Sequence, residues 1–213
     1  MKQIIRNISF LVISFIFVHC GQQQAKAPGI PELEKPKTHS SLEQFKYDLK
    51  IVTGHFKPSE HPDFSIISPQ YADRQSLYMH KDALKAFIEM FKAAKADGIK
   101  LVIKSAARNF DYQKGIWEGK WTGKRLLNGK VNAAKKYDSD EDRALAILQY
   151  SSMPGTSRHH WGTDIDLNSF DNKYFEKGEG LKVFNWLNEH AGKYGFCRPY
   201  TEKGTDRKDG YEE

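Results

Sequence analysis

Cysteine is scarce in this chain of 213 residues, which contains only Cys20 and Cys197. Two cysteines cannot build the disulfide framework that stabilises many small secreted domains. Because Cys20 fits a different role, described below, Cys197 lacks a disulfide partner. We therefore expect Cys197 to be a buried, small apolar residue. A Cys20–Cys197 bridge is the alternative.

A hydrophobic run long enough to cross a bilayer is also missing. The longest mainly apolar stretch extends from Ile8 to Val18, whereas a membrane-spanning helix needs roughly 20 apolar residues. Its length suits the apolar core of a secretory signal, and Lys2 and Arg6 precede it without any acid. We therefore predict a signal peptide over residues 1–19 and export of the protein, with an uncleaved N-terminal anchor helix as the alternative.

Cys20 directly follows this stretch and precedes Gly21 and a polar segment. The arrangement resembles a bacterial lipoprotein signal, in which the cysteine becomes the lipidated N-terminus of the mature protein. His19 departs from the small residue usual at that position. Residues 20–41 are rich in Gln, Pro, Lys and Ser and predict a flexible tether. The expected product is a monomeric lipoprotein of the bacterial cell envelope, membrane-bound through its lipid, with a folded domain over residues 42–213.

Dense clusters of basic residues with interleaved aromatics are absent from the sequence. The 33 Lys and Arg residues exceed the 27 Asp and Glu residues by six, and removal of residues 1–19 leaves a net charge of +4. This modest excess does not indicate a nucleic-acid partner, and it suits an anionic envelope polymer or a membrane surface. Aromatic residues make up 13% of the chain, as in an ordinary folded soluble domain.

Apolar periodicity predicts an α+β fold with a small, mostly antiparallel sheet and flanking helices. A helix is expected within residues 80–100, and the apolar run Leu101–Ile103 predicts a buried strand. Further helices are expected over residues 140–151 and 180–196. Residues 162–168 alternate polar and apolar side chains, so Asp164 and Asp166 are expected to share one face of a strand.

A short segment carries residue types that can bind a metal ion, in the order Ser157-x-His159-x-x-Gly162-x-Asp164-x-Asp166. A histidine and an aspartate on either side of a tight turn can present one nitrogen and one oxygen to the same zinc ion. The spacing alone is equally compatible with a solvated loop histidine beside an aspartate at a strand end.

With Pro154-Gly155 before it, this segment resembles the zinc motif of the VanY-type D-alanyl-D-alanine carboxypeptidases. These are peptidoglycan metallopeptidases that share a fold with the Hedgehog signalling domain. Upstream, the segment with Ser105, Arg108, Tyr112 and Gln113 is similar to a second family motif. The segment FNWLNEHAGKYGFCRPY looks like the family's helix and Gly-Phe turn, so the resemblance covers residues 53–213.

The resemblance implies a role for several residues. His159 and Asp166 would be zinc ligands, and Arg108 would be the catalytic residue that binds the substrate near the scissile bond or at its terminal carboxylate. Ser157 and Gln113 would form hydrogen bonds with the peptide. The implied function is zinc-dependent removal of the C-terminal D-alanine from peptidoglycan stem peptides, with Zn²⁺ as the cofactor.

The resemblance leaves two neighbouring residues and the third zinc ligand open. His160 is expected to pack or to support the ligands, and Asp164 either supports a ligand or is a solvated acid.

Family members complete the site with Glu-x-x-His near the C-terminus, but no histidine follows His190 and the sequence stops at Glu213. We expect the Glu-x-x-His to follow Glu213 in a longer chain, with Glu213 itself as a candidate general base. The alternatives to this function are a catalytically inactive peptidoglycan-binding lipoprotein and an L,D-carboxypeptidase or endopeptidase of the same fold.

Overall fold

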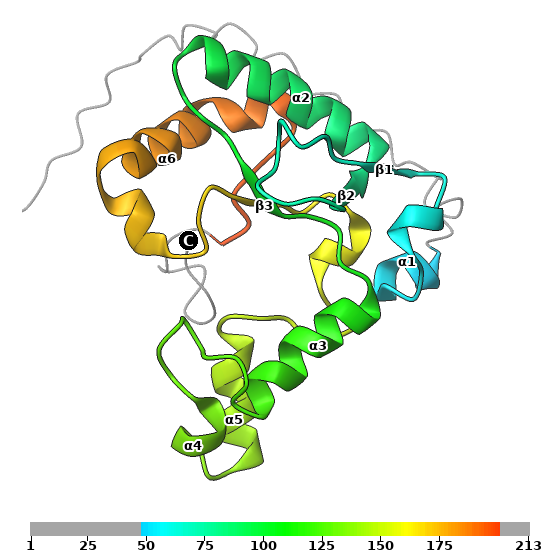
Figure 1. Cartoon of the computed structure of the whole chain (residues 1–213), viewed down its shortest axis with the longest axis vertical. Coiled ribbons are helices and arrows are strands. Elements are labelled where there is room, and N and C mark those ends of the chain that lie inside the picture. Colours follow the sequence, from blue (N-terminus) through cyan, green and yellow to red (C-terminus); the bar gives the residue numbers. More distant parts are fainter. Residues whose placement is uncertain (1–47, 201–213) are drawn as a thin grey trace, which may run out of the picture. The chain divides into compact units, whose positions relative to one another are not determined.

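The structure is a computed structural model and describes residues 48–200 (Figure 1). The predicted signal peptide, Cys20, the tether of residues 20–41, the predicted start of the domain at residue 42 and Glu213 lie outside this range. Within it, no helix combines the length and the hydropathy needed to cross a membrane.

Helices and short strands alternate irregularly along the described residues, as predicted for an α+β fold. The α-helices are α1 (Leu49–Thr53), α2 (Lys81–Ala96), α3 (Phe110–Trp121), α4 (Ala133–Lys136), α5 (Asp140–Leu148) and α6 (Gly178–His190). The 3₁₀ helices are η2 (Pro58–Glu60), η3 (Arg158–Trp161), η4 (Asn172–Glu176) and η5 (Ala191–Tyr194). The strands are β1 (Phe64–Ile66), β2 (Tyr78–His80), β3 (Ile103–Ser105) and β4 (Asp166–Leu167). β1 pairs with β2 and β3 with β4, both antiparallel.

The helix predicted within residues 80–100 is α2, one of the two long helices beside the central strands in Figure 1. The His80 ring accepts a hydrogen bond from the Asp82 amide and so caps the N-terminus of α2. Leu84, Phe87, Met90 and Ala94 are buried along one face at helical spacing. α2 therefore supplies a large part of the main core.

The predicted buried strand is displaced by two residues toward the C-terminus. Leu101 and Ile103 are buried as expected, but β3 begins only at Ile103. The reason lies in Asn168, whose side-chain oxygen accepts a hydrogen bond from the Val102 amide while its backbone N–H donates to the Val102 carbonyl oxygen. The backbone N–H and C=O of Val102 are thus hydrogen-bonded to Asn168, outside regular strand pairing.

The helices predicted over residues 140–151 and 180–196 are confirmed. They are α5 and, for the second, α6 followed by η5, which ends at Gly195. Cys197 lies just beyond and is exposed, so the prediction of a buried cysteine is wrong. Phe196 packs against the core, and the neighbouring residue in a non-helical chain points the other way.

Two apolar clusters stabilise the described residues. The larger includes Met79, Phe87, Ile103 and Trp186 and joins α2, α6 and the strands. The smaller is centred on Leu127 and Ile147 and joins α3, α4 and α5, which lie together at the lower end of Figure 1. Two segments connect these regions, one between β3 and α3 and one from η3 to β4. Both contain predicted site residues.

Candidate active site

The turn after η3 brings one histidine and two aspartates together. Gly162 ends η3 in the left-handed conformation, with φ of 70°, and reverses the chain so that the following carboxylates face His159. His159 Nε2 lies 3.7 Å from Asp164 Oδ2 and 3.6 Å from Asp166 Oδ2. The two aspartates share one side of the segment, as predicted, while Ile165 and Leu167 pack against the core.

The protonation state of His159 is set by its surroundings. Its Nδ1 lies 2.9 Å from the Ala106 carbonyl oxygen, so Nδ1 carries the proton and donates it to that oxygen. Burial, reinforced by the Arg108 charge, lowers the pKa of His159 to about 4. The ring is therefore neutral at physiological pH, and Nε2 presents a lone pair toward the two carboxylates.

Arg108 lies between β3 and α3 and is held by three side chains. Its Nη2 donates to Asp166 Oδ2 at 2.6 Å, its Nε to Ser105 Oγ at 2.8 Å and its Nη1 to Gln113 Oε1 at 3.4 Å. These contacts orient the planar guanidinium beside the His159–Asp166 pair. Burial raises the pKa of Asp166, and the positive charge and hydrogen bond of Arg108 act in the opposite direction.

The two residues predicted to bind substrate are both buried. Gln113 uses its amide within the protein, since Oε1 accepts from Arg108 and Nε2 donates to the Ser152 carbonyl oxygen at 2.7 Å. Ser157 is 2% exposed at the start of η3. The structure thus brings Gln113 into the site as a support for Arg108 and for the chain at Ser152. Direct contact of Gln113 and Ser157 with a substrate stays a prediction.

His160 points away from the two aspartates and joins two backbone segments. Its Nδ1 donates to the Arg108 carbonyl oxygen at 2.6 Å, and its Nε2 accepts from the Gly155 amide at 3.1 Å. The expected packing role fits these contacts, which His160 makes from the 3₁₀ helix η3. His160 fixes the backbone from which the Arg108 side chain projects.

A glycine beside His160 makes this arrangement sensitive to substitution. Gly54 has φ of 80°, and a Cβ there would overlap the His160 ring, whereas a Cβ at Gly98, with φ of 75°, meets no atom within 4 Å. Both substitutions to alanine cost about 1 kcal/mol for the left-handed backbone. We expect Gly54→Ala to cost about 1–3 kcal/mol more through overpacking, measured by urea unfolding against Gly98→Ala as the control. Equal losses in the two variants would contradict the packing role of His160.

The depressed pKa of His159 makes the stability of the metal-free protein depend on pH. Between pH 6.5, the ordinary pKa of histidine, and about 4, the unfolded chain binds a proton at His159 and the folded chain does not. The free energy of unfolding therefore falls by a few kcal/mol as the pH drops through this window. Urea unfolding at several pH values should show this slope in the wild type and a smaller one in His159→Gln. Parallel profiles of the two proteins would show that His159 is not the titrating group.

The donor set fits two positions of a zinc site. A neutral imidazole with a free Nε2, held by a backbone carbonyl at Nδ1, and a carboxylate oxygen nearby are ordinary zinc ligands. Among residues 48–200 no group of three or more His, Cys, Asp or Glu is arranged to hold a metal ion. His159 and Asp166 thus fit two of the three protein ligands of a catalytic zinc site.

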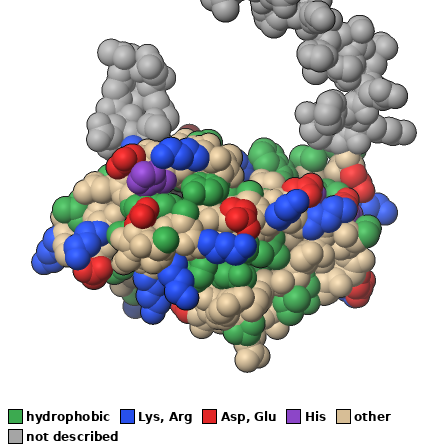
Figure 2. All heavy atoms as spheres, turned by 90° about the horizontal axis from the view of Figure 1, so that it is seen from above, with side chains coloured by type: hydrophobic (Ala, Val, Ile, Leu, Met, Phe, Trp, Pro, Cys, Tyr) green, Lys and Arg blue, Asp and Glu red, His purple; other side chains and the backbone are tan. Residues whose placement is uncertain are grey.

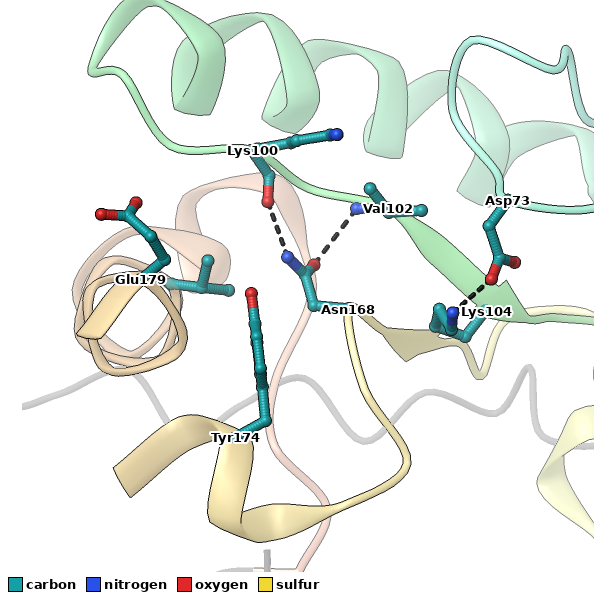
Figure 3. A pocket seen from close by; sticks show the side chains of 8 residues that line it. Asp73, Lys100, Val102, Lys104, Asn168, Tyr174 and Glu179 are labelled. Atoms are coloured by element: carbon teal, nitrogen blue, oxygen red, sulfur yellow. Dashed lines mark hydrogen bonds and ion pairs between the residues drawn. The ribbon is translucent and has the colours of Figure 1, made fainter. Parts of the chain in front are cut away.

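Other parts of the surface have a different character. A pocket of about 450 Å³ lies beside β3 and includes Lys104, Asn168 and Tyr174 in its lining (Figure 3). Lys104 faces this pocket and pairs with Asp73, whereas Ser105, the next residue of the strand, contacts Arg108. On the face shown in Figure 2, cationic and anionic side chains are interspersed.

Comparison with known proteins identifies the family. Residues 76–213, more than half of the chain, match the family model described as VanY, D-alanyl-D-alanine carboxypeptidase. The chain belongs to the VanY family. Both sequence motifs, with Arg108 in one and His159 and Asp166 in the other, lie inside the matched VanY region.

Two curated relatives and one solved structure are similar to this VanY-family chain. YodJ of Bacillus subtilis (strain 168), a carboxypeptidase by name, is 28% identical over 187 residues, which cover 85% of this chain and 59% of YodJ. A D-alanyl-D-alanine carboxypeptidase of Enterococcus faecalis (strain ATCC 700802 / V583) is 30% identical over 118 residues, 55% of this chain and 39% of that protein. The chain thus spans less than two thirds of the length of either relative.

The solved structure of the LdcB LD-carboxypeptidase, reported with the molecular basis of its peptidoglycan recognition, has the same fold. It superposes with a TM-score of 0.52 at 25% identity, covering 72% of this chain and 65% of LdcB. The predicted α+β architecture of the Hedgehog and D-Ala-D-Ala peptidase type is therefore confirmed.

Proposed function

We propose that this protein is a zinc-dependent D,D-carboxypeptidase that removes the C-terminal D-alanine from peptidoglycan stem peptides. The observation that carries the proposal is the convergence of His159 Nε2, Asp166 and the Arg108 guanidinium at one place. Membership of the VanY family supports the reaction class. Export and lipidation at Cys20, proposed from the N-terminal pattern, would place the protein in the compartment that contains peptidoglycan.

The residues of the site have separate tasks in this proposal. His159 and Asp166 would hold the zinc ion, which when bound lowers the pKa of a water molecule and polarises the scissile carbonyl. Ala106 keeps His159 in the tautomer that leaves Nε2 free. Arg108 offers paired N–H donors that match a substrate carboxylate or the negative charge that develops on the carbonyl oxygen.

We propose that two groups required for catalysis lie outside the described residues. A catalytic zinc site has three protein ligands, and hydrolysis needs a general base to accept a proton from water. We propose the family's Glu-x-x-His for both roles, with the histidine as third ligand and the glutamate as base. Asp164 does not replace the base in this proposal, since it pairs with Arg158 Nη2 at 3.4 Å.

The likeness to LdcB makes L,D-carboxypeptidase activity the second candidate. Three peptides discriminate the candidates: one ending in D-Ala-D-Ala, one ending in an L-residue followed by D-Ala, and one cross-linked peptide with an internal D-Ala bond. We expect mass spectrometry to show loss of a single alanine from the first peptide. Loss of alanine only from the second would establish the L,D-activity, and cleavage only of the internal bond an endopeptidase. Binding without cleavage of any peptide would favour the inactive binding protein.

A further inference from the structure

Lys120 is a half-buried cation for which the described residues provide no carboxylate partner. It lies near the C-terminal end of α3, and its Nζ donates to Ser151 Oγ at 2.6 Å and to the Tyr150 carbonyl oxygen at 3.4 Å. Within residues 48–200 no Asp or Glu oxygen lies within ion-pair distance of its Nζ, although other lysines of the chain pair with acids. Neutral groups thus surround this charge: two oxygens and the Tyr150 ring, whose centroid lies 5.9 Å from Nζ.

The charged groups that act on Lys120 make its position less favourable still. Burial, together with the positive charges of Arg108 and Arg125, lowers the pKa of Lys120 to about 8. Removing a cation from water among like charges is costly unless an anion compensates it. A bound carboxylate would supply that compensation, and Lys120 is partly exposed.

A continuous series of contacts connects Lys120 to the active site. Lys120 bonds Ser151, the next residue Ser152 bonds Gln113, and Gln113 bonds Arg108, which bonds Asp166. Gln113 and Lys120 are seven residues apart on α3, which corresponds to two turns and a separation of about 10 Å along the helix axis. An extended peptide covers this distance in about three residues.

We propose that Lys120 is a specificity-determining residue that binds a second carboxylate of the substrate, on a side chain about three residues before the peptide's C-terminus. This proposal rests on the proposed function, in which Arg108 interacts with the C-terminal end of the same peptide. The preferred substrate is then an acidic peptide with two separated negative charges, of which Arg108 and Lys120 each bind one.

The test uses two pairs of D-Ala-D-Ala peptides that differ only in one glutamate or glutamine, at the third or at the fourth position from the C-terminus. Affinity is measured calorimetrically on the full-length, chelator-treated protein, so that the peptides stay intact. We expect the glutamate member of at least one pair to bind about tenfold more tightly, as for a hydrogen bond between charged groups. Lys120→Met should abolish this preference, and Lys120→Arg should retain much of it.

Lys114→Met is the matched control, because Lys114 lies on the same helix but is exposed and pairs with Glu118. It should leave the preference unchanged. Equal or undetectable binding of both members in both pairs, or a preference that survives in Lys120→Met, would overturn the inference. Hydrolysis of the same peptides by the zinc-loaded protein is scored separately. Charge-selective binding without hydrolysis would contradict the proposed function alone, and hydrolysis without selectivity would contradict this inference alone.

Discussion

Replacement of His159 by alanine is expected to abolish both zinc retention and hydrolysis of a D-Ala-D-Ala peptide. His159 provides the one neutral imidazole whose free nitrogen faces Asp166 within the described residues, at 3.6 Å from Oδ2. Metal binding depends on each ligand, and the proposed hydrolysis depends on the metal. Asp166→Asn should have the same effect, because an amide does not supply the negative charge of the carboxylate. Zinc content by atomic emission and alanine release are measured on the same samples.

Asp164→Asn is the control for this experiment. Asp164 lies at nearly the same distance from His159 as Asp166 does, but it pairs with Arg158 while Asp166 pairs with Arg108. We expect Asp164→Asn to retain zinc and most of the activity. If Asp164→Asn lost zinc while Asp166→Asn kept it, the ligand assignment would have to be exchanged between the two aspartates.

Replacement of Arg108 by alanine is expected to separate catalysis from metal binding. A guanidinium cannot ligate a cation, so zinc should remain bound. The kcat/KM should nevertheless fall by about 100-fold or more, on the order of 3 kcal/mol, as for the loss of one donor that stabilises developing charge. Steady-state kinetics with parallel zinc determination measure both quantities.

Arg108→Lys tests the geometric part of this role. Lysine restores a positive charge, but its ammonium cannot reproduce the fork that contacts Asp166, Ser105 and Gln113 at once. We expect it to recover only part of the lost kcat/KM. Full activity of Arg108→Ala would show that this arginine does not act on the substrate, and full activity of Arg108→Lys would show that charge alone suffices.

Local patterns in the sequence predicted much of the site. The alternation of residues 162–168 placed Asp164 and Asp166 on one side, and the structure has both carboxylates near His159. The family motifs predicted that Arg108 would lie beside them, although 58 positions separate it from Asp166. Periodicity could not have revealed that contact, because it depends on how β3 and β4 pair.

Other features depend on tertiary contacts that leave no local signal. No helix was predicted at α3, whose glycines at positions 115 and 119 and single fully buried residue, Gln113, give it a weak apolar face. The role of Gln113 as a support for Arg108, and the position of Lys120 beside Ser151, therefore emerged only with the structure. The exposure of Cys197 was missed because cysteines are often buried, whereas this one follows the last described helix.

The most direct test of the account is the release of D-alanine from a D-Ala-D-Ala peptide as a function of bound zinc. The full-length protein is treated with a chelator, dialysed and titrated with zinc while alanine release is followed. We predict that chelation removes the activity and that zinc restores it in proportion, up to one ion per chain. Release of alanine by the fully zinc-free protein, or its absence at saturating zinc, would contradict a zinc-dependent carboxypeptidase built around His159 and Asp166.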